Sequence, residues 1–285
     1  MNHFFIITNA LKDKELHVTK KIIAYISEKG GAASYAASVD AKGSHMILKK
    51  DVPKGTECIL VIGGDGTLIR AARDTGDLGI PLIGVNLGKL GYLCELEENT
   101  ISWAIDELFA NHYTVEDRMM LGGYALKKQH TTEEHTALND IVIHRAGALQ
   151  IVNLNVSVNG EYLCSFKADG IILATPTGST GYNMSAGGPI VEPQARMILM
   201  TPINSHTLNS RSIVINPEDE VTIELGMRRS EKDEQVVVSF DGDYEVKLEV
   251  GDKIVVHQAK DSAKILKISK ISFLEILRKK MQTYT

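Results

Sequence analysis

The residues best suited to chemistry form a run of glycines around one carboxylate, Gly63-Gly64-Asp65-Gly66-Thr67. Glycines let the backbone approach a phosphate closely, and free N–H groups at the start of a helix attract anions. A carboxylate there would repel the phosphate unless it holds a magnesium ion or accepts the proton of an attacking hydroxyl. The run predicts phosphoryl transfer; the alternative is a tight Asp-Gly turn that caps a helix. The predicted phosphate-binding residues are Gly63, Gly64, Gly66, Thr67 and Arg70.

Three further polar segments predict a nucleotide site. Asn86-Leu87-Gly88-Lys89-Leu90-Gly91-Tyr92 follows a strand pattern and should border the same crevice as the glycine run. Asn139-Asp140 precedes an apolar run, so its side chains need partners such as ribose hydroxyls or a base edge, unless the pair only makes a local turn. Residues 167–189 combine glycines, small hydroxyls and Tyr182. A flexible linker has a similar composition, but an aromatic base and its ribose suit this segment better.

The elements that must position these residues change character near residue 118. Before it, apolar runs at 4–7, 57–62 and 81–85 alternate with helical spacing, which predicts a doubly wound parallel α/β sheet. The glycine run follows the second of these strands, and such sheets bind ligands at the carboxyl ends of their strands.

After residue 118 the pattern is that of antiparallel strands. Residues 152–158 alternate strictly, and Asn159-Gly160 supplies a two-residue hairpin turn before 161–166. Polar insertions at 127–135 and 228–234 are predicted as exposed hairpin tips, and residues 271–281 have helical spacing. We expect an α/β domain over 1–118, a β domain over 119–264, and a tail over 265–285 that packs back on the first domain.

Composition bounds the class of protein. The 285 residues are 44% hydrophobic and 24% charged, as in a globular protein, and the net charge of −5 provides no basic field for nucleic acid or an anionic membrane. No run approaches the roughly 18 apolar residues that would cross a bilayer. Cys58, Cys94 and Cys164 are far apart and read as reduced thiols. We expect a cytoplasmic protein that binds neither nucleic acid nor membranes.

Taken together, the motifs resemble those of the NAD kinase family. The GGDGT run alone is shared with diacylglycerol and sphingosine kinases and, more loosely, with phosphofructokinases. Its combination with Asn86-x-Gly-x-Leu-Gly-Tyr92, Asn139-Asp140, Asp169-Gly170, the run 175–182 and the segment 206–211 is more specific. The resemblance implies an N-terminal α/β domain and a C-terminal β-sandwich-like domain. It also implies transfer of the terminal phosphoryl of ATP or polyphosphate to the 2′-hydroxyl of the adenosine ribose of NAD, with a divalent metal ion, expected to be Mg²⁺.

The same resemblance assigns roles to single residues. Asp65 matches the family's general base, Asn139 and Asp140 match its nucleotide-gripping pair, and Asp169 matches an acid that binds an amide or amino group of NAD. Gly181 stands where alanine is common, and Asp243 stands where Gln or His is frequent, which argues against a binding role for Asp243. The predicted NAD-binding residues are Asp65, Gly66, Tyr92, Asn139, Asp140, Lys167, Asp169, Thr177, Thr180, Gly181, Tyr182, Asn183, Met184, Ser185 and Asn204.

Two other functions compete with an NAD kinase. A lipid kinase would share only the GGDGT run, and the segment 175–189 together with the lack of a membrane-binding stripe argues against it. A non-catalytic NAD-binding sensor would not need the intact Asp65. The resemblance further implies a homodimer or homotetramer built through the β domain.

Overall fold

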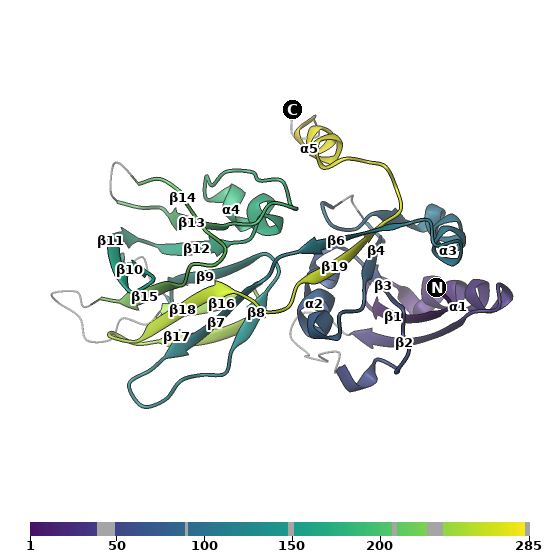
Figure 1. Ribbon diagram of the computed structural model, residues 1–285, viewed down its shortest axis with the longest axis horizontal. Helices are drawn as coiled ribbons and strands as arrows, with labels where there is room; N and C mark the ends of the chain where they lie inside the picture. The colour runs from purple at the N-terminus through teal and green to yellow at the C-terminus, as the bar shows by residue number, and fades with distance from the viewer. Residues whose placement is uncertain (39–48, 89–90, 148–150, 207–209, 227–235, 283–285) are drawn as a thin grey trace. The chain divides into compact units, whose positions relative to one another are not determined.

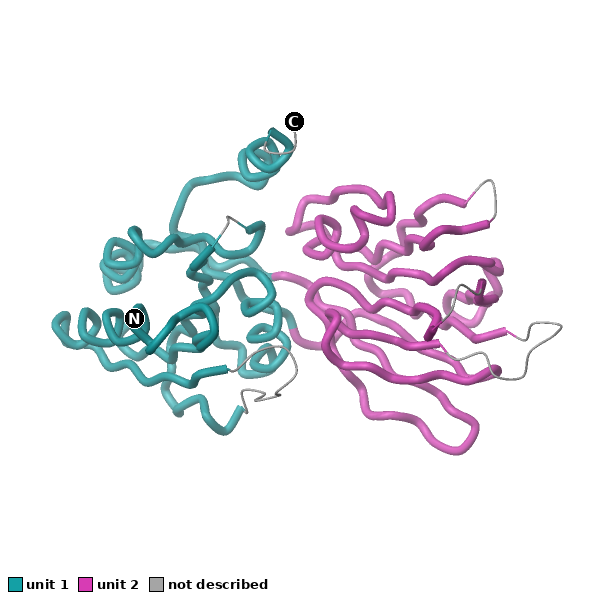
Figure 2. The backbone as a smooth tube through the Cα atoms, turned by 180° about the vertical axis from the view of Figure 1, so that it is seen from behind, with its two compact units in different colours: residues 1–117, 262–285 teal, residues 118–261 magenta. Residues whose placement is uncertain are grey.

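The computed structural model describes residues 1–38, 49–88, 91–147, 151–206, 210–226 and 236–282 (Figure 1). The chain divides into two compact units, Met1–Asp117 with Ser262–Thr285 and Arg118–Asp261 (Figure 2), and each is treated by itself below. The boundary expected after residue 264 falls inside strand β19 (Ala263–Lys267), which pairs with a strand of the first unit. The predicted hairpin tip at 228–234 lies outside the described residues.

The first unit is built on a sheet with strand order β2-β1-β3-β4-β19-β6, and β5 also pairs with β4. Strands β3 (Cys58–Gly63) and β4 (Leu82–Asn86) are parallel and buried along their whole length, which confirms the predicted parallel α/β architecture. The other strands are β1 (His3–Asn9), β2 (Ala32–Ser38), β5 (Leu96–Glu97) and β6 (Thr114–Arg118).

Helices cover this sheet because each presents an apolar stripe. Ile22 and Ile26 from α1 (His17–Glu28) share one core cluster with Ile105 and Leu108 from α3 (Ile101–Phe109). Helix α2 (Asp65–Thr75) contacts β3 and β4. Short 3₁₀ turns complete the unit at η1 (Lys14–Leu16), η2 (Lys49–Asp51), η3 (Gly76–Leu78) and η4 (Glu98–Thr100).

The tail belongs to the first unit. After β19, the Glu95 carboxylate accepts hydrogen bonds from the backbone N–H groups of Ile268 and Ser269. Helix α5 (Phe273–Gln282) follows, and the Lys280 ammonium lies 5.2 Å from the centre of the Tyr92 ring. Among the described helices, none is long and apolar enough to span a membrane.

The second unit consists of two antiparallel sheets, with strand orders β11-β10-β15-β18-β7-β8 and β14-β13-β12-β9-β16-β17. Alternate side chains of both sheets, such as Val156 and Val238, meet in one apolar core, as the predicted alternation requires. The Asn159-Gly160 turn has positive φ at both residues (+51° and +79°), which is the geometry of a two-residue hairpin.

The described strands of this unit are β7 (Leu121–Leu126), β8 (His135–Ala137), β9 (Asp140–Arg145), β10 (Val152–Val158), β11 (Glu161–Ala168), β12 (Gly170–Ala174), β13 (Ile198–Ile203), β14 (Ile213–Ile215), β15 (Val221–Leu225), β16 (Val236–Phe240), β17 (Tyr244–Leu248) and β18 (Lys253–Gln258). Between β12 and β13 the chain forms the turn η5 (Thr177–Thr180) and the short helix α4 (Tyr182–Ser185).

Candidate functional site

The glycine run lies at the carboxyl end of β3, where the sequence predicts it. Strand β3 ends at Gly63, and the carbonyl of Gly64 accepts the N–H groups of Thr67 and Leu68 at 2.9 and 3.1 Å as α2 begins. A Cβ atom at position 63 would lie 2.4 Å from the Thr67 hydroxyl oxygen, so only glycine fits there. The result is a tight loop at the N-terminus of an 11-residue helix, a suitable place for a phosphate group.

Asp65 is anchored by the segment that follows β4. Its Oδ2 accepts the backbone N–H of Tyr92 at 2.6 Å, and its Oδ1 accepts those of Leu93 and Cys94 at 3.2 and 3.0 Å. A Cβ at Gly91 would lie 2.0 Å from Oδ1, so glycine lets this segment approach the carboxylate. Asp65 therefore links the loop after β3 to the segment after β4.

Two further groups belong to the region of the glycine loop, the Cys94 thiol and Arg70. Burial and, secondly, the charge of Asp65 raise the pKa of the Cys94 thiol, so the sulfur stays protonated beside the carboxylate. Arg70 lies half-buried one turn along α2 from Gly66. The predicted phosphate-binding residues thus share one loop and the first turns of one helix.

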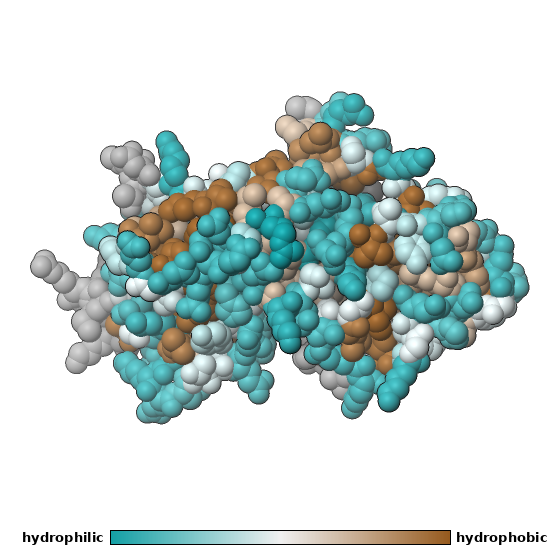
Figure 3. Space-filling model, in the orientation of Figure 1, coloured by the Kyte–Doolittle hydropathy of each residue, from teal (hydrophilic) through white to brown (hydrophobic). Residues whose placement is uncertain are grey.

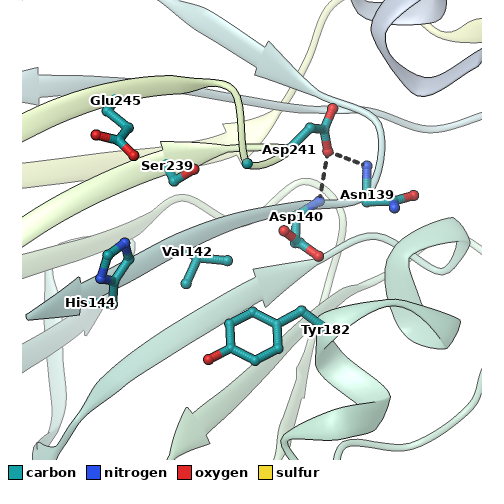
Figure 4. Close-up of a pocket in the computed structure, with 9 residues that line it drawn as sticks. Asn139, Asp140, Val142, His144, Tyr182, Ser239, Asp241 and Glu245 are labelled. Atoms are coloured by element: carbon teal, nitrogen blue, oxygen red, sulfur yellow. Dashed lines mark hydrogen bonds between the residues drawn. The ribbon is translucent and has the colours of Figure 1, made fainter. Parts of the chain in front are cut away.

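In the second unit, Asp241 holds the Asn139–Asp140 pair in place. Asp241 occupies the β16–β17 turn with φ +51°, a conformation that Asp tolerates. Its carboxylate accepts the N–H groups of Leu138, Asn139 and Asp140 at 2.8, 2.8 and 3.1 Å, and Figure 4 shows the last two bonds. Sequence reasoning missed this residue, because an Asp-Gly pair between two strands signals only a turn.

These residues border a hollow of about 440 Å³ (Figure 4). The Asn139 Oδ1 atom is buried and has no hydrogen-bond partner among the residues that the structure describes. Burial and, secondly, the charge of Asp241 raise the pKa of the Asp140 carboxyl from 3.8 to about 7. The lining residues are Asn139, Asp140, Val142, His144, Tyr182, Ser239, Asp241, Gly242 and Glu245.

The segment from Thr175 to Ser185 packs against the Asn139–Asp140 pair. The Thr175 hydroxyl donates to the Leu138 carbonyl at 2.6 Å, and a Cβ at Gly178 would lie 2.1 Å from the Asn139 carbonyl oxygen. The Thr177 hydroxyl oxygen is buried and has no partner within the described parts of the chain. The segment is therefore packed into the fold and is not a linker, and its Tyr182 lines the hollow.

Two neighbouring residues of this segment, Tyr182 and Asn183, have side chains in different surroundings. The Tyr182 side chain is 46% exposed and lines the hollow, so it does not fill the β core. Asn183, predicted from the resemblance as a ligand contact, is fully buried. Its amide donates to the Pro189 carbonyl at 3.0 Å and accepts the Thr201 hydroxyl at 2.7 Å, so this side chain holds the segment in place instead of facing the hollow. The segment's other predicted contacts that are partly or largely exposed are Thr180, Gly181, Met184 and Ser185, and none of them lines the hollow.

A second hollow of about 400 Å³ shares only His144 and Tyr182 with the first. Asp169 and Asn204 line it, and the Asn204 amide donates to the Asp169 carboxylate at 2.9 Å. His144 was missed by sequence reasoning, although β-strand alternation from Asp140 through Val142 places it on the same face. Lys167 and Asp243 are exposed and line neither hollow.

The predicted site residues therefore form two groups. Asp65, Gly66 and Tyr92 lie together in the first unit, where Asp65 binds the backbone of Tyr92. The remaining predicted residues lie in the second unit, and those that line the two hollows are Asn139, Asp140, Asp169, Tyr182 and Asn204.

Comparison with known proteins identifies the family. The family model of the ATP-NAD kinase N-terminal domain matches residues 4–113, and that of the ATP-NAD kinase C-terminal domain matches residues 138–268. The NAD kinase of Agathobacter rectalis is 55% identical over 286 residues and covers 100% of both chains. That of Lachnoclostridium phytofermentans is 39% identical and covers 98% of this chain and 99% of its own.

Solved structures share the fold. Yeast NADH kinase complexed with NADH superposes with a TM-score of 0.88 at 24% identity, covering 99% of this chain and 88% of its own. An NAD kinase from Archaeoglobus fulgidus in complex with ATP gives a TM-score of 0.78 at 20% identity, covering 99% of each chain. With both domain models matched and relatives aligned along the whole sequence, the chain belongs to the NAD kinase family.

Proposed function

We propose that this chain transfers the terminal phosphoryl group of ATP, or of polyphosphate, to the 2′-hydroxyl of the adenosine ribose of NAD, giving NADP. The observation that carries the acceptor assignment is the hollow lined by Asn139, Asp140 and the exposed Tyr182 ring. Adenosine offers the matching groups: an amino donor, hydroxyl donors and a flat aromatic face. Family membership and the GGDGT loop support the reaction type.

We propose that Asp65 orients the ribose hydroxyl and accepts its proton. A carboxylate has about four acceptor positions, so the three backbone N–H groups leave one for the attacking hydroxyl. The same three bonds fix the direction of the carboxylate, and phosphoryl transfer depends mainly on such alignment and on charge neutralisation. On this proposal the anchoring of Asp65 prepares the group for proton transfer.

We propose that the divalent ion, Mg²⁺, binds with the donor nucleotide. The described residues contain no group of three or more His, Cys, Asp or Glu that would form a protein cage. Mg²⁺ keeps several waters and is commonly held by substrate phosphates with only one or two carboxylates. Asp65 is the carboxylate of the glycine loop and is already engaged by backbone donors. The ion would then neutralise charge on the phosphates next to the loop.

The test is direct detection of product. The protein is incubated with NAD, ATP and magnesium, and NADP is measured with an NADP-specific dehydrogenase; polyphosphate replaces ATP in a parallel reaction. Asp65→Asn serves as the control for contaminating activity. NAD binding without NADP formation from either donor would identify a sensor, and phosphorylation of diacylglycerol but not of NAD would identify a lipid kinase.

We also propose that the protein is a cytoplasmic homodimer or homotetramer associated through the second unit. Apolar side chains gather over β14 on the face shown in Figure 3, where Val214 is 57% exposed. Cys58 and Cys94 are buried free thiols, which suits a reducing compartment. Sedimentation of the parent protein and of Val214→Asp tests the interface: a monomeric variant supports it, and an unchanged oligomer places the interface elsewhere.

A further inference from the structure

The turn after β1 is held firmly on both sides of Lys12. On one side, the Asn9 side-chain oxygen accepts the N–H groups of Leu11 and Lys12 at 3.0 and 3.3 Å. On the other side, the Asp13 carboxylate accepts the N–H groups of Val18 and Thr19 at 2.9 Å each and so fastens the start of α1. Burial opposes its ionisation, but the hydrogen bond from the Thr19 hydroxyl and the two backbone bonds lower the pKa of Asp13, so it stays charged and the turn keeps its shape.

The fold places this turn beside the glycine loop. Strands β1 and β3 are parallel neighbours, with Thr8 opposite Ile62, so the segments that follow them emerge at the same edge of the sheet. The Lys12 ammonium donates to the Gly63 carbonyl at 3.4 Å. It also lies 2.8 Å from the position that a Cβ of Gly64 would occupy, so the glycine leaves room for the cation.

This placement brings a full positive charge to the loop of residues 63–67, which contains no cationic side chain. Backbone N–H groups at a helix start carry only partial charge, whereas the phosphate chain of a donor carries several full negative charges. A lysine ammonium has three donors, and Gly63 engages one of them at a long distance. A bond of this kind on an exposed side chain stabilises a fold very little, so bracing the loop is a weak reason for a cation here.

We propose that Lys12 binds the phosphate chain of the phosphoryl donor, a nucleoside triphosphate or inorganic polyphosphate. The inference rests on the proposed function only in that the donor phosphates occupy the loop of residues 63–67. Lys12 holds the phosphates as a point charge, while the loop N–H groups set their position.

The test uses Lys12→Met and Lys12→Arg, with Lys20→Met as the matched control. Lys20 is an exposed lysine of α1, so its substitution changes the net charge equally. Binding of inorganic tripolyphosphate is measured by calorimetry without NAD, and the Michaelis constants for ATP and NAD are measured separately. A charge-assisted hydrogen bond is worth about 1.5–3 kcal/mol, which corresponds to a loss of roughly 10–100-fold in affinity.

We expect Lys12→Met to weaken tripolyphosphate binding and raise the Michaelis constant for ATP by this factor. The Michaelis constant for NAD in Lys12→Met should stay within about two-fold of the parent value. Lys12→Arg should retain most of the tripolyphosphate binding, and Lys20→Met should bind tripolyphosphate as the parent does. If Lys12→Met binds tripolyphosphate as the parent does but melts at a lower temperature, the inference is wrong, and Lys12 only stabilises the loop through its hydrogen bond to Gly63. If the parent makes NADP but does not bind tripolyphosphate, the inference is also wrong. If Lys12→Met loses tripolyphosphate while the parent makes no NADP, the proposed function fails and the inference about Lys12 stands.

Discussion

Replacing Asp140 by Asn is expected to stabilise the ligand-free protein, and to do so increasingly as the pH rises from about 4 to about 7. Burial and, secondly, the charge of Asp241 raise the pKa of the Asp140 carboxyl from 3.8 to about 7 in the folded protein. Within this window the unfolded chain has released the proton that the folded protein still binds. The free energy of unfolding of the parent therefore falls with rising pH across the window and levels off above it.

The size of the effect follows from the shift. From 3.8 to about 7 is a shift of about 3 pH units, and at about 1.4 kcal/mol per unit this corresponds to ~4 kcal/mol. Asp140 is only 6% exposed, so solvent screening removes little of it. The buried amide of Asn costs about 1–3 kcal/mol where it lacks partners, so we expect a net gain of ~1–3 kcal/mol at pH 8.

The assay is urea unfolding followed by circular dichroism at pH 5, 6, 7 and 8. It compares the parent, Asp140→Asn and Asp261→Asn, an exposed aspartate of the same unit that serves as control. The difference in free energy of unfolding between Asp140→Asn and the parent should grow by about 1 kcal/mol per pH unit up to pH 7. A difference that is independent of pH, or one that shrinks as the pH rises, would refute the assignment of a protonated buried carboxyl.

Four further outcomes are expected at the two groups of site residues. Asp140→Ala should weaken NAD binding by roughly 1–3 kcal/mol through lost hydrogen bonds and leave ATP affinity almost unchanged, as calorimetry would show. Tyr182→Ala should raise the Michaelis constant for NAD with the melting temperature nearly intact, because the ring is exposed; a drop of several degrees with normal kinetics would contradict this. Asp65→Asn should lower the turnover number by roughly 10²–10⁴-fold with NAD affinity within a few-fold of the parent, and recovery on adding magnesium would instead identify a metal ligand. Gly91→Ala, whose Cβ would lie 2.0 Å from Asp65 Oδ1, should lower the turnover number while calorimetry finds NAD binding to the second unit unchanged.

The sequence predicts those parts of the fold that depend on residues close together in the chain, such as single strands and tight turns. The buried runs of β3 and β4 read as parallel strands because both of their faces are covered, and Asn159-Gly160 marked a hairpin because glycine and asparagine accept positive φ. The glycine loop was located because its glycines directly follow the buried run of β3. Each of these features depends on neighbours within a few residues.

The features that escaped prediction depend on distant contacts. Asp241 binds the N–H of Leu138 across 103 residues, and Asp65 binds that of Tyr92 across 27, and no local spacing encodes either pairing. Asn183 lies in a run of polar residues that suggested ligand binding, yet Thr201 from the neighbouring strand turns its side chain inward. The motif located the segment beside the hollow, and tertiary packing decided that Tyr182 lines the hollow while Asn183 is buried.

The position of β19 bears on how the protein is made. This strand lies between β4 and β6 in the first unit, yet it is encoded by residues 263–267, after the whole of the second unit. A ribosome delivers residues in order, so the sheet begun by β1 lacks an interior strand until residues 263–267 have been synthesised. The second unit, Arg118–Asp261, is contiguous and has all of its strands earlier. The first unit is therefore expected to complete its sheet after the second unit has its strands, with the Leu82 end of β4 unpaired on one side until β19 arrives.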